Sequence, residues 1–175
     1  MIHIGIDPGL TGAIAVINKN GVPLIFDAPI LLIKGTKKDH RIIDANAAAR
    51  LLRPFSPVLS SEEPAHCFIE KIVAMPRSYR DKNGIEHQTK MGAVSMINYG
   101  VGYGIWIGIL AALNIPYTEV HPVTWKSKIM AGMGKEKDAS IARAKQLYPT
   151  ADLSLKKHHG RADALLIAHF GRSIS

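Results

Sequence analysis

The sequence is short of cysteine, of acidic residues and of any export signal. Cys67 is the single cysteine, so an internal disulfide and a multi-cysteine metal site are excluded, and a reducing compartment is favoured. The 14 acidic residues are outnumbered by 22 Lys and Arg, and the net charge of +8 indicates a polyanionic partner. The N-terminal segment lacks the basic start of a signal peptide, so we expect a cytoplasmic protein.

With 47% apolar and 21% charged residues, the composition is that of a globular domain, and we expect a single domain over residues 1–175. The long apolar run at 91–113 contains an asparagine, two tyrosines and five glycines. We therefore expect no membrane span but a buried helix, lying closely on a sheet or on a partner subunit. Gly100, Gly104 and Gly108 would allow short distances between backbones.

Apolar periodicity and turn residues predict an α/β protein with the order βββαβαβα and further helices near the end. The segment at 76–90 is polar and basic, and we expect an exposed loop there. The predicted strands cover residues 2–7, 12–18, 22–28, 66–73 and 115–120, and the predicted helices cover 41–53, 91–113, 122–130, 136–148 and 161–172.

Three carboxylates interrupt otherwise apolar segments. Asp7 ends the first strand, Glu70 lies in the fourth strand at its polar edge, and Asp163 lies in the last helix. Alone, each could cap a turn, pair with a cation or stabilise a helix start. Buried carboxylates persist only when they are paired, hydrogen-bonded or bound to metal. Taken together, the three favour a shared divalent cation at one edge of the sheet.

Two histidines and a lysine complete the catalytic candidates. His159 lies four residues before Asp163, one helical turn away, where an imidazole could bind a metal ion or move a proton. His158 is the second choice, and both histidines could instead belong to a solvated basic loop. Lys126, which follows Trp125, is a candidate for contact with a scissile phosphate.

Positive charge is concentrated after residue 120, where ten Lys or Arg accompany four acidic residues. Such side chains neutralise phosphates and make affinity sensitive to salt. The segment near residue 80 interleaves a tyrosine with cations, which suits base stacking and backbone contact. The candidate nucleic-acid contacts are Arg77, Tyr79, Arg80, Lys82, Lys126, Lys128, Lys135, Lys137 and Arg161.

The turn after the first strand allows a second interpretation. Residues 7–12, Asp-Pro-Gly-Leu-Thr-Gly, look like the first phosphate loop of sugar kinases and actin-like ATPases. Those enzymes close two such domains around a nucleotide, and this chain has the length of one. A non-catalytic nucleic-acid-binding protein is a further alternative, but it would not need three acids that repel phosphate.

Motifs spread over nearly the whole chain carry a family resemblance. They are Ile4–Gly9, Phe68–Glu70, Gly102–Leu113 followed by Ile115–Tyr117, Pro122–Lys126, and His159–Leu165, of which the last is the most specific. Together they resemble the RuvC-type Holliday-junction resolvases of the RNase H-like superfamily, in their phage and organellar branch. The resemblance suits the cytoplasm of a bacterium or of a phage-infected host.

The resemblance implies an RNase H-like fold, a central mixed five-stranded sheet flanked by helices. It implies a homodimeric crossover junction endodeoxyribonuclease, acting in DNA recombination and repair, that resolves four-way DNA junctions by paired symmetric nicks without a small-molecule cofactor. Two Mg²⁺ ions, or Mn²⁺ in their place, would be held by Asp7, Glu70 and Asp163. Many relatives have a fourth ligand at the position of Gly160, so His159, His158 or water would replace it. The alternative is an RNase H-like nuclease for RNA–DNA hybrids, flaps or other branched phage DNA.

Overall fold

The computed structural model describes residues 1–36, 39–59, 63–73, 77–89, 92–134 and 138–175. Its strands are β1 (Ile2–Asp7), β2 (Ala13–Ile17), β3 (Pro23–Asp27), β4 (Ile30–Ile33), β5 (His40–Ile43), β6 (Ala65–Glu70), β7 (Arg77–Arg80), β8 (Glu86–Thr89) and β9 (Tyr117–Val120). Its helices are α1 (Ala45–Leu52), the 3₁₀ turn η1 (Arg53–Phe55), α2 (Ala93–Ala112), α3 (Pro122–Ile129), α4 (Ala139–Leu147) and α5 (His159–Arg172).

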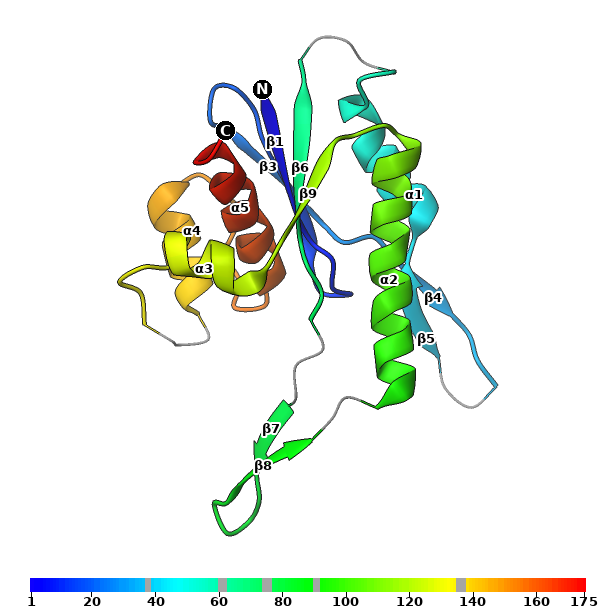
Figure 1. The fold of residues 1–175 in the computed structure, drawn as a ribbon, viewed down its shortest axis with the longest axis vertical. Helices are drawn as coiled ribbons and strands as arrows, with labels where there is room; N and C mark the ends of the chain where they lie inside the picture. Colours follow the sequence, from blue (N-terminus) through cyan, green and yellow to red (C-terminus); the bar gives the residue numbers. More distant parts are fainter. Residues whose placement is uncertain (37–38, 60–62, 74–76, 90–91, 135–137) are drawn as a thin grey trace.

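The elements form three layers around a five-stranded sheet with the order β3-β2-β1-β6-β9 (Figure 1). Helices α1 and α2 cover one face of this sheet, and α3, α4 and α5 cover the other. The sheet is mixed, because β1 pairs antiparallel with β2 and parallel with β6, and β6 pairs parallel with β9. The predicted α/β class and the mixed five-stranded sheet flanked by helices are therefore confirmed.

Small residues bring α5 unusually close to the sheet. A Cβ atom placed on Gly5 of β1 would lie 2.1 Å from the carbonyl oxygen of Ala164 and 2.4 Å from the backbone nitrogen of Ala168. The neighbouring strand presents Ala13 and Ala15, both fully buried, to the same helix. The single cysteine, Cys67, is fully buried in the core on the other face of the sheet. The fold thus holds α5 directly against β1, with backbone nearly touching backbone.

Two hairpins depart from the sequence-based expectations. Residues 41–43 belong to β5, so the predicted start of the first helix is wrong, and α1 begins after Asp44, whose carboxylate accepts a hydrogen bond from the Ala47 N–H at 2.9 Å. The segment expected to be a loop contains the antiparallel pair β7–β8, which stands away from the sheet (Figure 1). Asp81 closes its turn by accepting from the N–H of Asn83 at 2.8 Å. Part of the helix predicted from 136 lies outside the described residues.

Helix α2 is only partly covered. Trp106, Ile109 and Leu110 in its second half are buried, whereas Val94 and Ile97 near its start are 73% and 64% exposed. Cβ atoms on the glycines at 100, 104 and 108 would meet nothing within 4 Å among the described residues, so the expected close approach of these glycines to the sheet is wrong. The expected alternative, close packing on a partner subunit, stays a prediction. By length and composition α2 could cross a membrane, which for a single helix is weak evidence.

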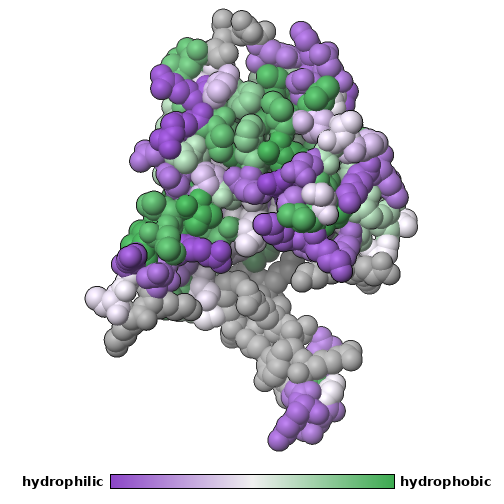
Figure 2. Space-filling model, turned by 180° about the vertical axis from the view of Figure 1, so that it is seen from behind, coloured by the Kyte–Doolittle hydropathy of each residue, from purple (hydrophilic) through white to green (hydrophobic). Residues whose placement is uncertain are grey.

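A second apolar area lies on the same flank of the molecule. Leu31, Leu32 and Ile33 of β4 are exposed by 48%, 56% and 43%. Figure 2 shows hydrophobic surface on the side where the β4–β5 hairpin lies, and a further hydrophobic area in the upper part of the same face. Exposed apolar surface of this kind is available for contact with another molecule.

Candidate functional site

The three acidic candidates meet at one end of the sheet. Asp7 is the last residue of β1 and Glu70 is the last residue of β6, the parallel neighbour of β1. Parallel strands present their carboxyl ends at the same edge of a sheet, so the two carboxylates share that edge. Asp163 comes from the start of α5, which the glycine contacts hold against β1. Each acid therefore reaches the site from a different element.

The carboxylate of Asp7 is strongly perturbed. Its Oδ1 accepts a hydrogen bond from the Gly9 N–H at 3.1 Å, which fixes the side chain over the β1–β2 turn. Loss of solvent, together with the negative charges of Asp163 and Glu70, raises the pKa of Asp7 to about 7, although the Gly9 hydrogen bond and Lys126 act in the opposite direction. A carboxylate held among other carboxylates in this way is typical of a functional site.

Trp125 positions Glu70, a role that the sequence did not indicate. The indole Nε1–H of Trp125, a fully buried residue of α3, donates to Oε2 of Glu70 at 2.6 Å. Burial raises the pKa of Glu70, and this hydrogen bond and the charge of Lys126 lower it. A tryptophan N–H can only donate, so it selects the ionised form of the acid and restricts its rotation.

Lys126 provides positive charge beside the acids. Its Nζ lies 5.0 Å from the centre of the Trp125 ring. The charge of Lys126 lowers the pKa values of Asp7, Glu70 and Asp163, which places the ammonium group within electrostatic reach of all three. Lys126 thus lies near the acids, and its part in the chemistry of the site stays a prediction.

Asp163 carries an oxygen with no partner. Burial raises its pKa, while a hydrogen bond from Ser140 and the charges of Lys126 and His159 lower it. Its Oδ1 is buried, and among the described residues it has no hydrogen-bond partner. An unpartnered buried carboxylate oxygen costs free energy unless a ligand satisfies it.

The donor set fits a hard divalent cation, because carboxylate oxygens are the ligands that Mg²⁺ and Mn²⁺ prefer. The unpartnered Oδ1 of Asp163, and the pKa of Asp7, raised by burial and by the charges of Asp163 and Glu70, agree with such an ion. Within the part of the chain that the structure describes, however, no three His, Cys, Asp or Glu side chains are close enough to hold an ion as they stand. The three carboxylates are neighbours that influence one another's charge, and they do not form a closed cage.

The histidines separate into two environments. His159 Nε2 lies 3.6 Å from Oδ1 of Asp138, and the His159 charge acts on Asp163, so this ring borders the acids. His158 is buried, and its Nδ1 accepts from the Leu155 N–H at 3.4 Å, in the loop before α5. The geometry favours His159 over His158 as the residue beside the acids.

Close packing explains why residue 160 is a glycine. A Cβ atom there would lie 2.1 Å from the carbonyl oxygen of Thr11 and 2.7 Å from Cα of Gly12. The start of α5 therefore touches the backbone of the β1–β2 turn at Gly160. The observed backbone leaves no room for a side chain at position 160, so a fourth acidic ligand does not fit there.

The candidate nucleic-acid contacts are scattered. Arg77, Tyr79 and Arg80 lie in β7, and Lys82 lies exposed in the turn that follows. The Lys128 ammonium lies 5.7 Å from the centre of the Phe170 ring. Lys135 and Lys137 lie outside the described residues.

Arg161 has a structural role instead. Its guanidinium binds Asp27 through Nε at 2.6 Å and Asp152 through Nη1 at 2.7 Å, and thus ties α5 to β3 and to the loop before α5. These contacts raise the pKa of Arg161 and lower that of Asp27. With two carboxylates already bound, Arg161 is not a free phosphate ligand in this structure.

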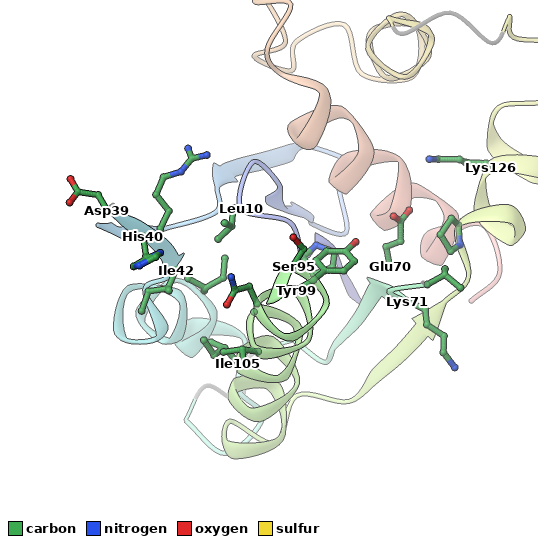
Figure 3. Close-up of a pocket in the computed structure, with 18 residues that line it drawn as sticks. Leu10, Asp39, His40, Ile42, Glu70, Lys71, Ser95, Tyr99, Ile105 and Lys126 are labelled. Carbon is green, nitrogen blue, oxygen red and sulfur yellow. The ribbon is translucent and has the colours of Figure 1, made fainter. Parts of the chain in front are cut away.

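A cavity of about 870 Å³ opens beside the acids (Figure 3). Glu70 and Lys126 lie at one end, and β5 and the first half of α2 form its other walls. Two wall residues, Arg41 and Tyr99, were missed by sequence reasoning, because residue 41 was assigned to a helix and α2 was expected to be buried. The size is within the roughly 300–1,000 Å³ of typical ligand sites.

The chain resembles known proteins in part of its sequence and in its whole fold. No family model matches it. Over 67 residues it is 42% identical to the chloroplastic Holliday junction resolvase MOC1 of Chlamydomonas reinhardtii, a match that covers 37% of this chain and 8% of that protein. Since that relative is chloroplastic, a cytoplasmic location for this chain stays a prediction.

Two solved structures of RuvC from Thermus thermophilus are similar over nearly the whole chain. The one in complex with a Holliday junction substrate has a TM-score of 0.54 and 16% identity, and covers 100% of this chain and 96% of that one. The other has a TM-score of 0.52 and 17% identity, and covers 99% and 96%. The chain therefore has the RNase H-like fold of RuvC, and the resemblance to RuvC-type resolvases that its sequence motifs indicate is confirmed.

Proposed function

We propose that this protein is a metal-dependent endonuclease that cuts four-way DNA junctions by paired symmetric nicks, as one nuclease domain over residues 1–175. The observation that carries the proposal is the meeting of Asp7, Glu70 and Asp163, from β1, β6 and α5, beside Lys126. The RuvC fold and the similarity to a junction resolvase support four-way junctions as the substrate.

Each residue of the site has its own role in the proposed phosphodiester hydrolysis. Two Mg²⁺ ions, or Mn²⁺, held by Asp7, Glu70 and Asp163 with His159 beside them, would supply activation of water and neutralisation of the leaving oxygen. Gly9 and Trp125 hold Asp7 and Glu70 in place through their hydrogen bonds. Lys126 offsets the negative charge that develops on the phosphate.

We propose that DNA is bound by positive charge around this site. Lys126 and Lys128 lie on α3, next to the acids, and the β7–β8 hairpin carries Arg77, Tyr79, Arg80 and Lys82 away from the sheet as an arm (Figure 1). The net charge of +8 supports a polyanionic partner. Lys135 and Lys137 remain predicted contacts, whereas the ion pairs of Arg161 argue against its inclusion.

Two copies are needed to place two nicks symmetrically on a four-way junction. Helix α2 offers an apolar surface for pairing, because Val94, Ile97 and Val101 recur at helical spacing and are 73%, 64% and 54% exposed. Gly104 and Gly108 continue this stripe and would allow two helices to approach closely. We propose a homodimer in which these stripes face each other.

The test is cleavage of a labelled four-way junction beside linear duplex, RNA–DNA hybrid and flap substrates, in Mg²⁺, in Mn²⁺ and in EDTA. We expect paired symmetric nicks in the junction that are lost in EDTA. Cleavage of the hybrid or flap instead would leave the nuclease site in place and favour the alternative substrate class. Tight binding without any cleavage would refute the enzymatic proposal.

A further inference from the structure

One side of α2 lines the cavity that opens beside the acids and has Glu70 in its wall. Ser95, Asn98, Tyr99 and Gly102 all border this cavity, together with Glu70 and Lys126. Their spacing of three, one and three residues puts them on a single helix face. At 100° per residue, this face lies roughly 130° around the helix from the apolar stripe proposed for the dimer. The two surfaces meet at Val101, which belongs to that stripe and also borders the cavity, whereas Ser95, Asn98 and Tyr99 lie outside the stripe.

The chemistry of this face differs from the rest of α2. Apart from Trp106, four side chains of α2 can form hydrogen bonds. Three of them, Ser95, Asn98 and Tyr99, border the cavity. Val94 and Ile97, on the other side of this part of the helix, are apolar and 73% and 64% exposed. The polar side chains of α2 that border the cavity are thus offset around the helix from its exposed apolar stripe.

Tyr99 is the member of this face that reaches the reacting end of the cavity. Figure 3 shows its ring beside Glu70, and the side chain is 37% exposed, so a bound molecule can contact it. Burial and the negative charges of Asp7 and Glu70 raise the pKa of Tyr99. The phenol therefore keeps its proton near neutral pH and is a hydrogen-bond donor.

The opposite wall provides a path for a strand of nucleic acid. His40 and Arg41 of β5 are exposed and line the cavity. Figure 3 shows His40 at the end away from Lys126. A strand whose scissile phosphate lies beside the acids could thus run along α2 with Arg41 close to a further phosphate. Tyr99 lies between these two cationic ends.

Building on the proposed nuclease function, we propose that Tyr99 is a substrate-contacting residue whose hydroxyl donates a hydrogen bond to a phosphate oxygen of the strand being cut. Phosphate is the fitting acceptor, because its oxygens carry negative charge and accept stronger hydrogen bonds than neutral groups do. Helix α2 thereby adds a further element to a site built from β1, β6, α3 and α5.

The test compares Tyr99→Phe with Tyr103→Phe in the full-length protein. Both changes remove one hydroxyl from the same helix, but Tyr103 is not among the residues that line the cavity, and its hydroxyl is buried. The readouts are the single-turnover cleavage rate at saturating enzyme, the dissociation constant for the substrate in EDTA, and the melting temperature. The substrate is whichever DNA or hybrid the unchanged protein cuts.

We expect Tyr99→Phe to slow cleavage by about 10- to 100-fold, which is the loss in rate expected when one hydrogen bond to a charged group is missing in the transition state. Its dissociation constant should stay within about 3-fold and its melting temperature should not change, whereas Tyr103→Phe should cleave within about 2-fold of the unchanged protein. A Tyr99→Phe rate equal to that of the unchanged protein, or equal losses in both variants, would overturn the role of Tyr99 alone. Failure of the unchanged protein to cut any substrate would overturn the nuclease proposal and this inference together.

Discussion

Replacing Gly160 with alanine should push the start of α5 away from the β1–β2 turn. The added Cβ would lie 2.1 Å from the carbonyl oxygen of Thr11 and 2.7 Å from Cα of Gly12, and both atoms are backbone that no rotamer change can move aside. Relief to ordinary contact requires a shift of roughly 1 Å between α5 and the turn, since carbon and oxygen rarely approach within about 3.2 Å.

The magnitude follows from two opposing effects. Overpacking costs about 1–3 kcal/mol, and occasionally more, as it should against rigid backbone. Alanine restores up to about 1 kcal/mol of helix propensity, less in a first helical turn. We expect a net loss of about 2 kcal/mol, which for a chain of this size lowers the melting temperature by about 4–8 °C.

The assay is thermal unfolding followed by circular dichroism, with His159→Ala as the control. That variant changes the adjacent residue, removes atoms and adds none, so its melting temperature should move by less than about 2 °C. Cleavage by Gly160→Ala should also fall, because the same contact sets the position of Asp163 relative to Asp7. A melting temperature for Gly160→Ala within 2 °C of the unchanged protein would refute the backbone contact.

Four further results are expected. Asp7→Asn should abolish cleavage and leave junction binding in EDTA intact, and cleavage at a near-normal rate would remove Asp7 from the site. Lys126→Ala should slow cleavage about 10- to 100-fold or reduce the salt dependence of binding by about one charge, and no change in either would place Lys126 outside the site. Burial, with nearby Arg172 and Arg143, lowers the pKa of His169, so the unfolded chain binds more protons and stability falls as the pH drops below about 6.5. The loss of unfolding free energy between pH 7.5 and 5.5 should be smaller in His169→Gln than in the unchanged protein. Carboxylates with raised pKa values stabilise the fold as the pH drops, but they are the same in both proteins. The difference between the two proteins therefore reports on His169 alone. Ile97→Asp should convert the proposed dimer to a monomer in light scattering, and an unchanged mass would exclude the α2 stripe as the interface.

The sheet and the positions of the acids were predictable because both follow from local patterns. Apolar, β-branched segments predict the five strands of the sheet, and a carboxylate at the end of such a segment, as in Asp7 and Glu70, marks the edge where parallel strands end. Asp163 could be grouped with them because it interrupts an apolar helix face. The sequence could not show that Trp125 donates to Glu70, since that contact depends on how α3 packs across the sheet.

The errors arose where short apolar segments are ambiguous. Ile30–Ile33 and Arg41–Ile43 lie in a hairpin outside the main sheet, and the second segment runs directly into helix-forming alanines. Only the cap at Asp44 separates strand from helix there. The importance of Tyr99 was hidden for another reason: α2 is so apolar that it predicts a core helix, while half of it borders a cavity or solvent.

The contact between β1 and α5 has a consequence for synthesis of the chain. The strand that carries Asp7 is made first, and the helix that carries Asp163 follows more than 150 residues later. Until α5 has left the ribosome, the small residues of β1 and β2 have nothing to pack against and the acids are not assembled. Closing so long a loop late in folding is slow. During synthesis, the basic segments between β9 and α5 should therefore be exposed before the three acids are brought together.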